Sequence, residues 1–137
     1  MNKIQITISN ETTYTFNFDV DSFFKRILCL KDINEGIYDI NFVSTKTMKT
    51  VNKTHLDRDY LTDVITFNLG SIQSPIGDIY ISPEKADENS KEFKNSLNDE
   101  IKLLLVHGIL HLLDYKDYSE EEKKEMDKEQ ERLLGLV

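Results

Sequence analysis

Two hydrophobic periods divide the chain into predicted strands and helices. Strict alternation of apolar and polar residues is typical of a half-buried strand. It occurs in 4–8, 14–18 and 37–43, and two more strands are expected over 64–67 and 76–81. Residues 11–13, between the first two of these segments, are expected to form a hairpin turn or a short connection.

Apolar residues recur at helical spacing between the strands and near the C-terminus. Helices are expected around 23–30, around 48–52, from 83 onward with Ala86 and Phe93 as its few apolar contacts, over 101–113, and from 120 to about 134. Helix-start signals support these assignments. The N-cap candidates are Asp21 or Ser22, Ser44 or Thr45, Ser82 before Pro83, Ser96 and Ser119, and Gly135 is a natural stop for the last helix. The order of elements predicts an α+β fold.

Composition bounds the class of protein. The chain has 137 residues, 39% of them hydrophobic and 31% charged, which fits one globular domain over residues 1–137. Cys29 is the only cysteine, so no intrachain disulfide can form, and we expect it to be a small buried hydrophobe. The N-terminus does not resemble a signal peptide, and the longest apolar run, 103–106, is too short to span a bilayer. We therefore expect a cytoplasmic protein with no membrane partner.

The balance of charge is acidic. Seventeen Lys and Arg residues stand against 25 Asp and Glu residues, a net charge of −8. This argues against a protein that coats nucleic acid or anionic membranes, and we expect no DNA partner. A nucleic-acid enzyme with a locally basic cleft or a bound cation remains compatible with the charge.

The candidate chemistry lies in the helix predicted over 101–113. His107 and His111 are four residues apart, about 40° apart around a helix, so they share one face. This spacing can present two imidazoles to one metal ion. The alternative is a pair of core histidines satisfied by backbone or carboxylate groups. The flanking residues are apolar, and each buried imidazole would leave a nitrogen unpaired, which favours the metal.

One position separates this motif from that of the zinc proteases. There, a glutamate directly follows the first histidine and acts as the general base. Gly108 occupies that position here, so a residue elsewhere must activate water. The third histidine of the chain, His55, has no partner at ligand spacing and is interpreted as a surface or supporting residue.

Four separated blocks of the sequence resemble the YbeY family of bacterial endoribonucleases. The blocks are His107-Gly108-Ile109-Leu110-His111 with Tyr115; Asn52 and Asp59 with 62–67; the strand end 77–82; and Met126, Gln130, Leu133 and Leu134 in the last helix. The resemblance runs from about Met48 to the C-terminus. It implies a single α+β domain with a mixed four- to five-stranded sheet and a buried helix that bears the histidines.

The resemblance also implies an activity. It indicates a metal-dependent, single-strand-specific endoribonuclease that matures the 3′ end of 16S rRNA and acts in ribosome quality control. The implied cofactor is one divalent metal ion, expected to be Zn²⁺. The implied partners are single-stranded rRNA and the ribosome or its proteins.

The chain departs from the family at several positions near the site, among them Tyr60-Leu61 in place of the usual Lys-Pro. Asp117 stands where the family has its third histidine ligand, and a carboxylate is an acceptable zinc ligand. Asp114, at the end of the helix where the family has glycine and where Asp tolerates left-handed backbone, is the alternative third ligand. Leu56 replaces a family arginine, and Arg58 is two residues further on.

Further residues are candidates for roles at the site. Asp63 and Asp78, at predicted strand ends, are expected to orient a ligand imidazole or take a proton, although strand-end aspartates also serve as turn or cap residues. Thr66 would supply a hydroxyl group. Candidate phosphate contacts are Lys53, Arg58 and Lys116, each of which also fits a solvated surface position.

Two other functions compete with the nuclease. One is a ribosome-assembly binding factor with a structural metal and little nuclease activity, which Leu56 and the net charge of −8 favour. The other is a metal-dependent hydrolase of another bond, such as a peptidase, which Gly108 argues against.

Overall fold

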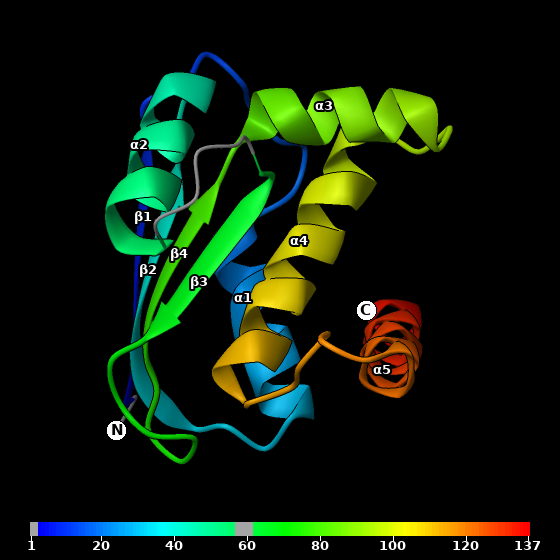
Figure 1. Ribbon diagram of the computed structural model, residues 1–137. Coiled ribbons are helices and arrows are strands. Elements are labelled where there is room, and N and C mark those ends of the chain that lie inside the picture. Colours follow the sequence, from blue (N-terminus) through cyan, green and yellow to red (C-terminus); the bar gives the residue numbers. More distant parts are fainter. Residues whose placement is uncertain (1–2, 57–61) are drawn as a thin grey trace.

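A four-stranded mixed sheet forms the centre of the fold, shown as a computed structural model in Figure 1. The structure describes residues 3–56 and 62–137. The strands are β1 (Lys3–Asn10), β2 (Glu35–Phe42), β3 (Val64–Asn68) and β4 (Ile76–Ile81), in the spatial order β1-β2-β4-β3. β1 and β4 run parallel to β2, and β3 pairs antiparallel with β4. The α+β class and the mixed sheet are therefore confirmed, with β3 at one edge.

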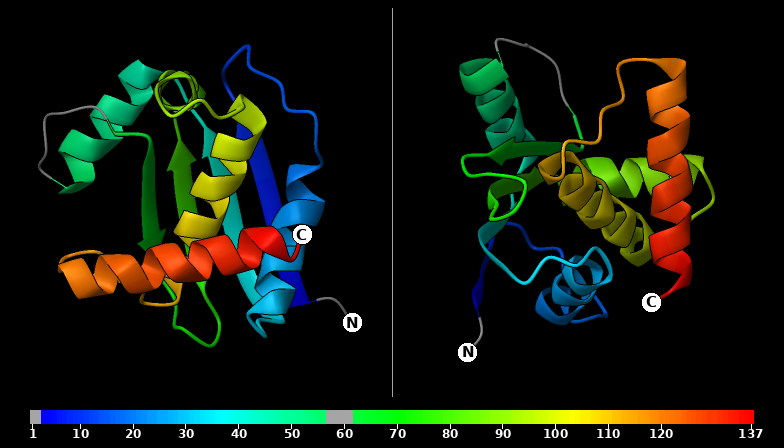
Figure 2. Two further views of the ribbon diagram at one scale, coloured as in Figure 1. Left: turned by 90° about the vertical axis from the view of Figure 1, so that its right-hand side faces the viewer. Right: turned by 90° about the horizontal axis from the view of Figure 1, so that it is seen from below.

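Helices cover both faces of this sheet (Figures 1 and 2). They are α1 (Val20–Leu30), α2 (Thr45–Leu56), α3 (Pro83–Glu92), α4 (Leu97–Leu112) and α5 (Glu120–Gly135). α1 and α4 lie on one face, and α5 crosses the outer side of α4. α2 lies on the other face, where Met48 packs with Val43 and Ile65. Among the described residues, no helix combines the length and apolarity needed to cross a bilayer.

The main core lies between the sheet and the pair α1 and α4. The central strands β2 and β4 alternate buried and more accessible residues, as expected for strands with one covered face. Their inward residues and the facing sides of both helices are fully buried: Phe24, Ile27, Leu28, Tyr38, Ile40, Ile79, Ile81, Ile101, Leu105 and Ile109. α4 is thus fixed against the sheet along most of its length.

Most of the predicted helix starts are confirmed. Ser82, Ser96 and Ser119 each accept a hydrogen bond from the backbone N–H three residues on, and Ser119 and Glu122 form a complete capping box. The start of α1 is a correction. Asp19, and not Asp21 or Ser22, is its N-cap and accepts from the Ser22 N–H at 3.2 Å. The helix begins earlier because Val20 is already part of the buried stripe.

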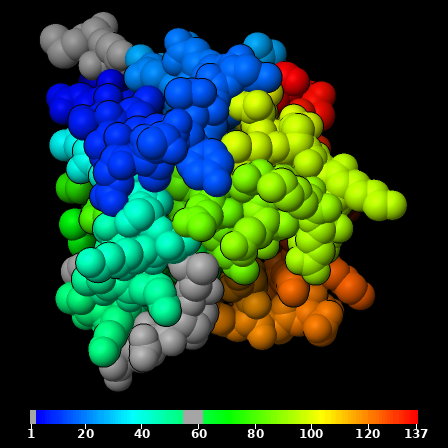
Figure 3. All heavy atoms as spheres, turned by 90° about the horizontal axis from the view of Figure 1, so that it is seen from above, coloured from blue at the N-terminus to red at the C-terminus, as the bar shows by residue number. Residues whose placement is uncertain are grey.

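The strand expected over 14–18 is wrong. These residues form an irregular connection, and the N-terminal part of the chain lies beside α3 on the surface shown in Figure 3. The Asn17 N–H donates to Asn98 Oδ1 of α4, and Tyr14 Oη donates to Asp87 of α3. The alternation arose because Phe16 and Phe18 both pack inward against the core, while the backbone pairs with side chains instead of a strand.

Two expectations about burial are also wrong. Cys29 is exposed, because the buried stripe of α1 runs through Phe24, Ile27 and Leu28 and leaves position 29 on the outer side. Phe93 is 71% exposed. It is the C-cap residue of α3 and follows the last turn of that helix.

Candidate metal centre

Gly108 lets α4 approach the sheet closely at the level of the histidines. A β-carbon at this position would lie 3.2 Å from Cδ1 of Ile79 and 3.3 Å from Oγ1 of Thr66. Both distances are tighter than ordinary van der Waals contact. Packing therefore explains why glycine occupies the position at which zinc proteases have glutamate. The close approach also places the histidines of α4 next to the edge strand β3.

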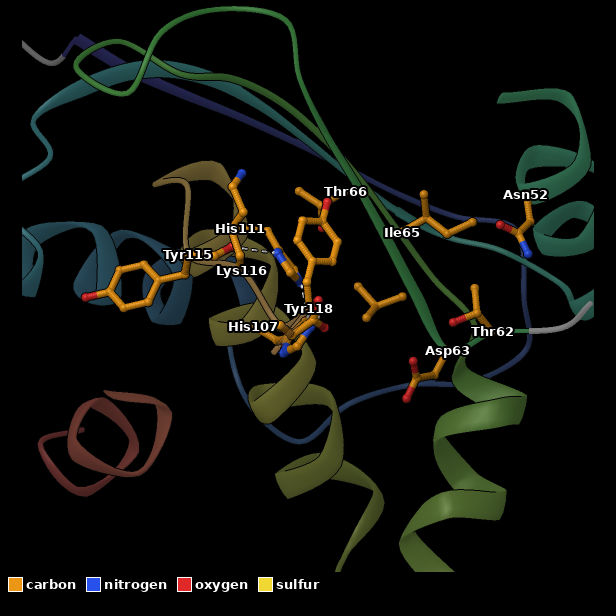
Figure 4. A pocket seen from close by; sticks show the side chains of 12 residues that line it. Asn52, Thr62, Asp63, Ile65, Thr66, His107, His111, Tyr115, Lys116 and Tyr118 are labelled. Atoms are coloured by element: carbon orange, nitrogen blue, oxygen red, sulfur yellow. Dashed lines mark hydrogen bonds and ion pairs between the residues drawn. The ribbon is translucent and has the colours of Figure 1, made fainter. Parts of the chain in front are cut away.

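A cleft of about 460 Å³ opens between that edge and the segment that follows α4 (Figure 4). Residues of α2, β3, α4 and the α4–α5 connection line it: Asn52, Thr62, Asp63, Val64, Ile65, Thr66, His107, His111, Tyr115, Lys116, Asp117 and Tyr118. The volume lies in the range of small-molecule and cofactor sites.

The two imidazoles meet at the inner end of this cleft. Their Nε2 atoms are 2.8 Å apart, and the ring planes are inclined at 79°. Each Nδ1 atom has a partner on the other side. Nδ1 of His107 lies 2.6 Å from Oε1 of Gln130, and Nδ1 of His111 lies 3.1 Å from the Tyr115 carbonyl oxygen.

These partners determine where the protons of the imidazoles lie. The Tyr115 carbonyl can only accept, so Nδ1 of His111 donates to it. The Gln130 amide nitrogen lies 3.3 Å from a carboxylate oxygen of Asp127, to which it donates, so the amide oxygen faces His107 and Nδ1 of His107 donates as well. In the neutral state both Nε2 atoms are then acceptors with lone pairs directed at each other. Such a pair needs a cation between its members, either a metal ion or a proton.

Burial and the set of donor atoms favour a metal ion over a proton. Burial, together with the neighbouring His107, lowers the pKa of His111 below its usual value of 6.5, so the imidazole tends to stay neutral at neutral pH. Asp117 stands beside the pair, with Oδ2 at 3.9 Å from Nε2 of His111. One ligand atom from each of His107, His111 and Asp117 lies within 4.8 Å of the others, and these three residues can hold a metal ion.

Asp114 lies outside this cluster. Its backbone is left-handed, with φ at 71°, as expected for a residue at the end of α4. Its carboxylate accepts from Nζ of Lys116 at 2.7 Å and is exposed. The geometry therefore favours Asp117 over Asp114 as the third ligand.

Residues of α5 and of the end of α1 form an ionic group around Tyr115, whose carbonyl oxygen is the partner of His111. Tyr115 Oη lies between Nζ of Lys31 at 3.1 Å and the carboxylate of Glu129, and Lys31 also pairs with Glu129. Hydrogen bonds from Arg132 and Lys31 lower the pKa of Glu129 to about 2. This ionic group anchors Tyr115, whose carbonyl oxygen receives the His111 hydrogen bond.

Two of the residues predicted to serve catalysis line the cleft. Asp63 immediately precedes β3, and one of its carboxylate oxygens accepts from the Asn89 amide at 3.0 Å. Thr66 faces α4, but its hydroxyl oxygen is buried against the helix and has no hydrogen-bond partner in the described part of the chain. Thr66 therefore contributes to the wall of the cleft, while its hydroxyl group is closed off from solvent.

The structure does not bring Asp78 to the cleft. Asp78 lies within β4, where Ile79 and Ile81 are buried under α4, so its side chain points to the opposite face of the sheet. There it accepts from the Asn41 amide at 2.9 Å.

The three residues predicted to contact phosphate lie in different places. Lys116 lines the cleft, and Lys53 is exposed on α2, next to Asn52. Arg58 lies outside the described residues, as do the side chains of His55 and Leu56.

Sequence reasoning missed the supporting role of Gln130. Gln130 is 7% exposed and shares the inward stripe of α5 with Met126 and Leu133. A polar residue within such a stripe indicates a buried hydrogen-bond partner. The identity of that partner, 23 residues away in sequence, depends on how α5 packs on α4.

Comparisons with known proteins give the family of the chain and agree with the fold. The sequence model of a family described as "Endoribonuclease YbeY" matches residues 5–137. A protein of that name from Flavobacterium johnsoniae is 31% identical over 132 residues, covering 96% of this chain and 91% of its own. One from Oceanobacillus iheyensis is 33% identical and covers 92% and 93% of the two chains. The solution structure of TM1509 from Thermotoga maritima superposes with a TM-score of 0.65 at 27% identity, over 94% of this chain and 86% of its own.

Proposed function

The chain belongs to the YbeY family of endoribonucleases, and we propose that it cleaves single-stranded RNA at the cleft beside α4 with the help of one metal ion. The observation that carries this proposal is the pair of opposed imidazole acceptors, 2.8 Å apart, with Asp117 beside them. Two nitrogens and one carboxylate oxygen form a set of three protein ligands that leaves a further position open, as in catalytic zinc sites.

We assign His107, His111 and Asp117 as the ligands and zinc as the metal. Imidazole and carboxylate ligands with an open position suit Zn²⁺. When bound there, such an ion makes water more acidic, bringing its pKa to about 7, and polarises a phosphoryl oxygen.

Other residues of the chain orient the ligands, accept a proton and contact phosphate. Gln130 and the Tyr115 carbonyl keep each Nε2 free of a proton and directed into the cleft. Asp63 is placed on the β3 side of the cleft to accept a proton, since its second carboxylate oxygen has no partner among the described residues. Lys116 at the mouth of the cleft is the first candidate for a phosphate contact, and Lys53 is the second.

The proposed cellular role is inferred from membership of the family. We propose that the substrate is 16S rRNA near its 3′ end, cut during maturation and quality control of ribosomes in the cytoplasm. A net charge of −8 gives weak general attraction for RNA. The ribosome or one of its proteins therefore delivers the substrate to residues 1–137, which we treat as one hydrolase domain.

The test compares wild type with His111→Ala on single-stranded and duplex RNA over a series of salt concentrations. Asp78→Asn is the matched control, because it removes a carboxylate on the far face of the sheet. We expect metal-dependent cleavage of the single strand by wild type and the control, slow cleavage of duplex, and none by His111→Ala. Equal cleavage by His111→Ala would place the activity elsewhere. Ribosome binding without any cleavage would favour the assembly-factor function.

A further inference from the structure

Tyr118 stands at the mouth of the cleft with most of its surface exposed. The residue is 82% exposed, more than Leu69 at 76% or Phe93 at 71%, the other strongly exposed large hydrophobic residues of the described chain. It follows Asp117 directly in sequence and lines the same cleft as His107 and His111. In Figure 4 its ring reaches over the cleft in front of β3.

This ring contributes little to the stability of the fold, because most of the residue is exposed to water. A flat molecule that covered one face would remove apolar area from water and gain a stacking contact. Unpaired nucleobases are flat partners of this kind, and stacking on aromatic side chains is a common way in which proteins hold single-stranded RNA. The position beside the metal-ligand cluster would keep such a base close to the reacting phosphate.

The charge of the cleft strengthens the case for stacking. Asp63 and Asp117 line it, and Lys116 is the one cation among its described lining residues. That lysine already pairs with Asp114, and its Nζ lies 5.9 Å from the centre of the Tyr118 ring. The protein side chains that line the cleft therefore add little attraction for phosphate beyond that of the proposed metal ion, and contacts that do not depend on charge supply part of the affinity for RNA.

We propose that Tyr118 is the stacking platform for one unpaired base of the RNA strand that enters the cleft. The inference rests on the proposed endoribonuclease function and assigns it a substrate-binding residue. A base within a duplex is already paired and stacked between its neighbours, so it cannot cover the ring without leaving the helix. Tyr118 thereby contributes to the selection of single strands.

The experiment measures binding of two labelled 2′-O-methyl RNA single strands, which resist cleavage: one with bases and one abasic strand of equal length. Tyr118→Ala removes the ring, and Tyr118→Phe keeps it. Phe93→Ala is the matched control, since it removes an exposed aromatic ring outside the cleft. We expect Tyr118→Ala to weaken binding of the base-containing strand roughly 5- to 100-fold and to leave the abasic strand unaffected. Tyr118→Phe and Phe93→Ala should bind both strands like wild type.

Two results would overturn the proposal: unchanged binding of the base-containing strand by Tyr118→Ala, or equal weakening for both strands. Cleavage kinetics separate this proposal from the function on which it rests. With an active enzyme, Tyr118→Ala should raise KM at unchanged kcat and unchanged metal content, as expected when uniform binding is lost. If wild type cleaves no RNA, the proposed function fails, while the comparison of the two strands still decides whether Tyr118 binds a base.

Discussion

Replacing Gln130 by leucine removes the acceptor that faces His107 and keeps a side chain of similar size in a buried position. In the wild type, the hydrogen bond to Oε1 of Gln130 holds the proton of His107 on Nδ1. Without that acceptor, the proton can move to Nε2, the atom directed at His111. A proton there competes with a metal ion for the same lone pair. We therefore expect Gln130→Leu to bind zinc more weakly.

The size of the effect follows from burial. Gln130 is 7% exposed, and its oxygen lies 2.6 Å from Nδ1 of His107. Leaving a buried donor of this kind without a partner costs about 1–3 kcal/mol. Substitutions that remove the hydrogen-bond partner of a metal-bound histidine weaken metal binding by about 10- to 100-fold, which corresponds to ~1.4–2.8 kcal/mol. The two estimates agree, so a loss within this range is the expected result.

The assay is competition for zinc against a chelator, at a temperature where every variant is folded by circular dichroism. Gln130→Glu restores an acceptor and should bind zinc at least as tightly as wild type. Glu131→Leu, an exposed position one residue further along α5, is the control for a lost polar side chain on that helix. Unchanged zinc affinity in Gln130→Leu would refute the assigned proton positions and, with them, the argument from opposed lone pairs.

Three further predictions concern acidic residues. Asp117→Ala should weaken metal binding in a chelator titration more than Asp114→Ala, and Asp117→His should retain the metal; the reverse order would move the third ligand to Asp114. Asp63→Asn should lower kcat by about 100-fold at unchanged metal content, with Asp78→Asn as the unaffected control, and an unchanged kcat would exclude Asp63 as proton acceptor. The pKa of Glu129 is lowered from 4.5 to about 2, so its contribution to stability is present above pH 4.5 and is lost as the pH falls toward 2. Glu129→Gln should therefore be less stable than wild type at neutral pH, and denaturant unfolding should show the difference shrinking in acid; a constant difference would contradict the role of the ion pairs.

Local signals were sufficient for most of the fold. A cap, a proline at the first helical position or an alternating strand acts within a few residues, so Ser82, Ser96 and Ser119 could be recognised from the sequence. The segment 14–18 could not. Its alternating pattern arises because two phenylalanines point inward. The position of α4 determines whether its backbone pairs with a strand or with the Asn98 side chain.

In the candidate site, too, local spacing predicted some features, while others depend on how distant segments pack. The spacing of His107 and His111 was enough to place two imidazoles together, and Asp117 followed from the family pattern. The groups behind the imidazoles belong to α5 and to the turn after α4, and the docking of those segments is not encoded by spacing. For Asp78, the strand pattern itself contained the answer: because Ile79 and Ile81 face α4, Asp78 must face the other side.

Gly108 links the packing of the fold to the chemistry that the cleft can support. In a zinc protease the residue after the first histidine carries the general base. Here the space that such a side chain would need is filled by Ile79 and Thr66, so α4 cannot supply a base from that position without moving away from the sheet. A base must then come from the opposite wall of the cleft. Among the described residues that line it, Asp63 and Asp117 are the carboxylates, and Asp117 is assigned to the metal. The close approach of helix and sheet that organises the histidines therefore leaves Asp63 as the carboxylate that we propose accepts the proton.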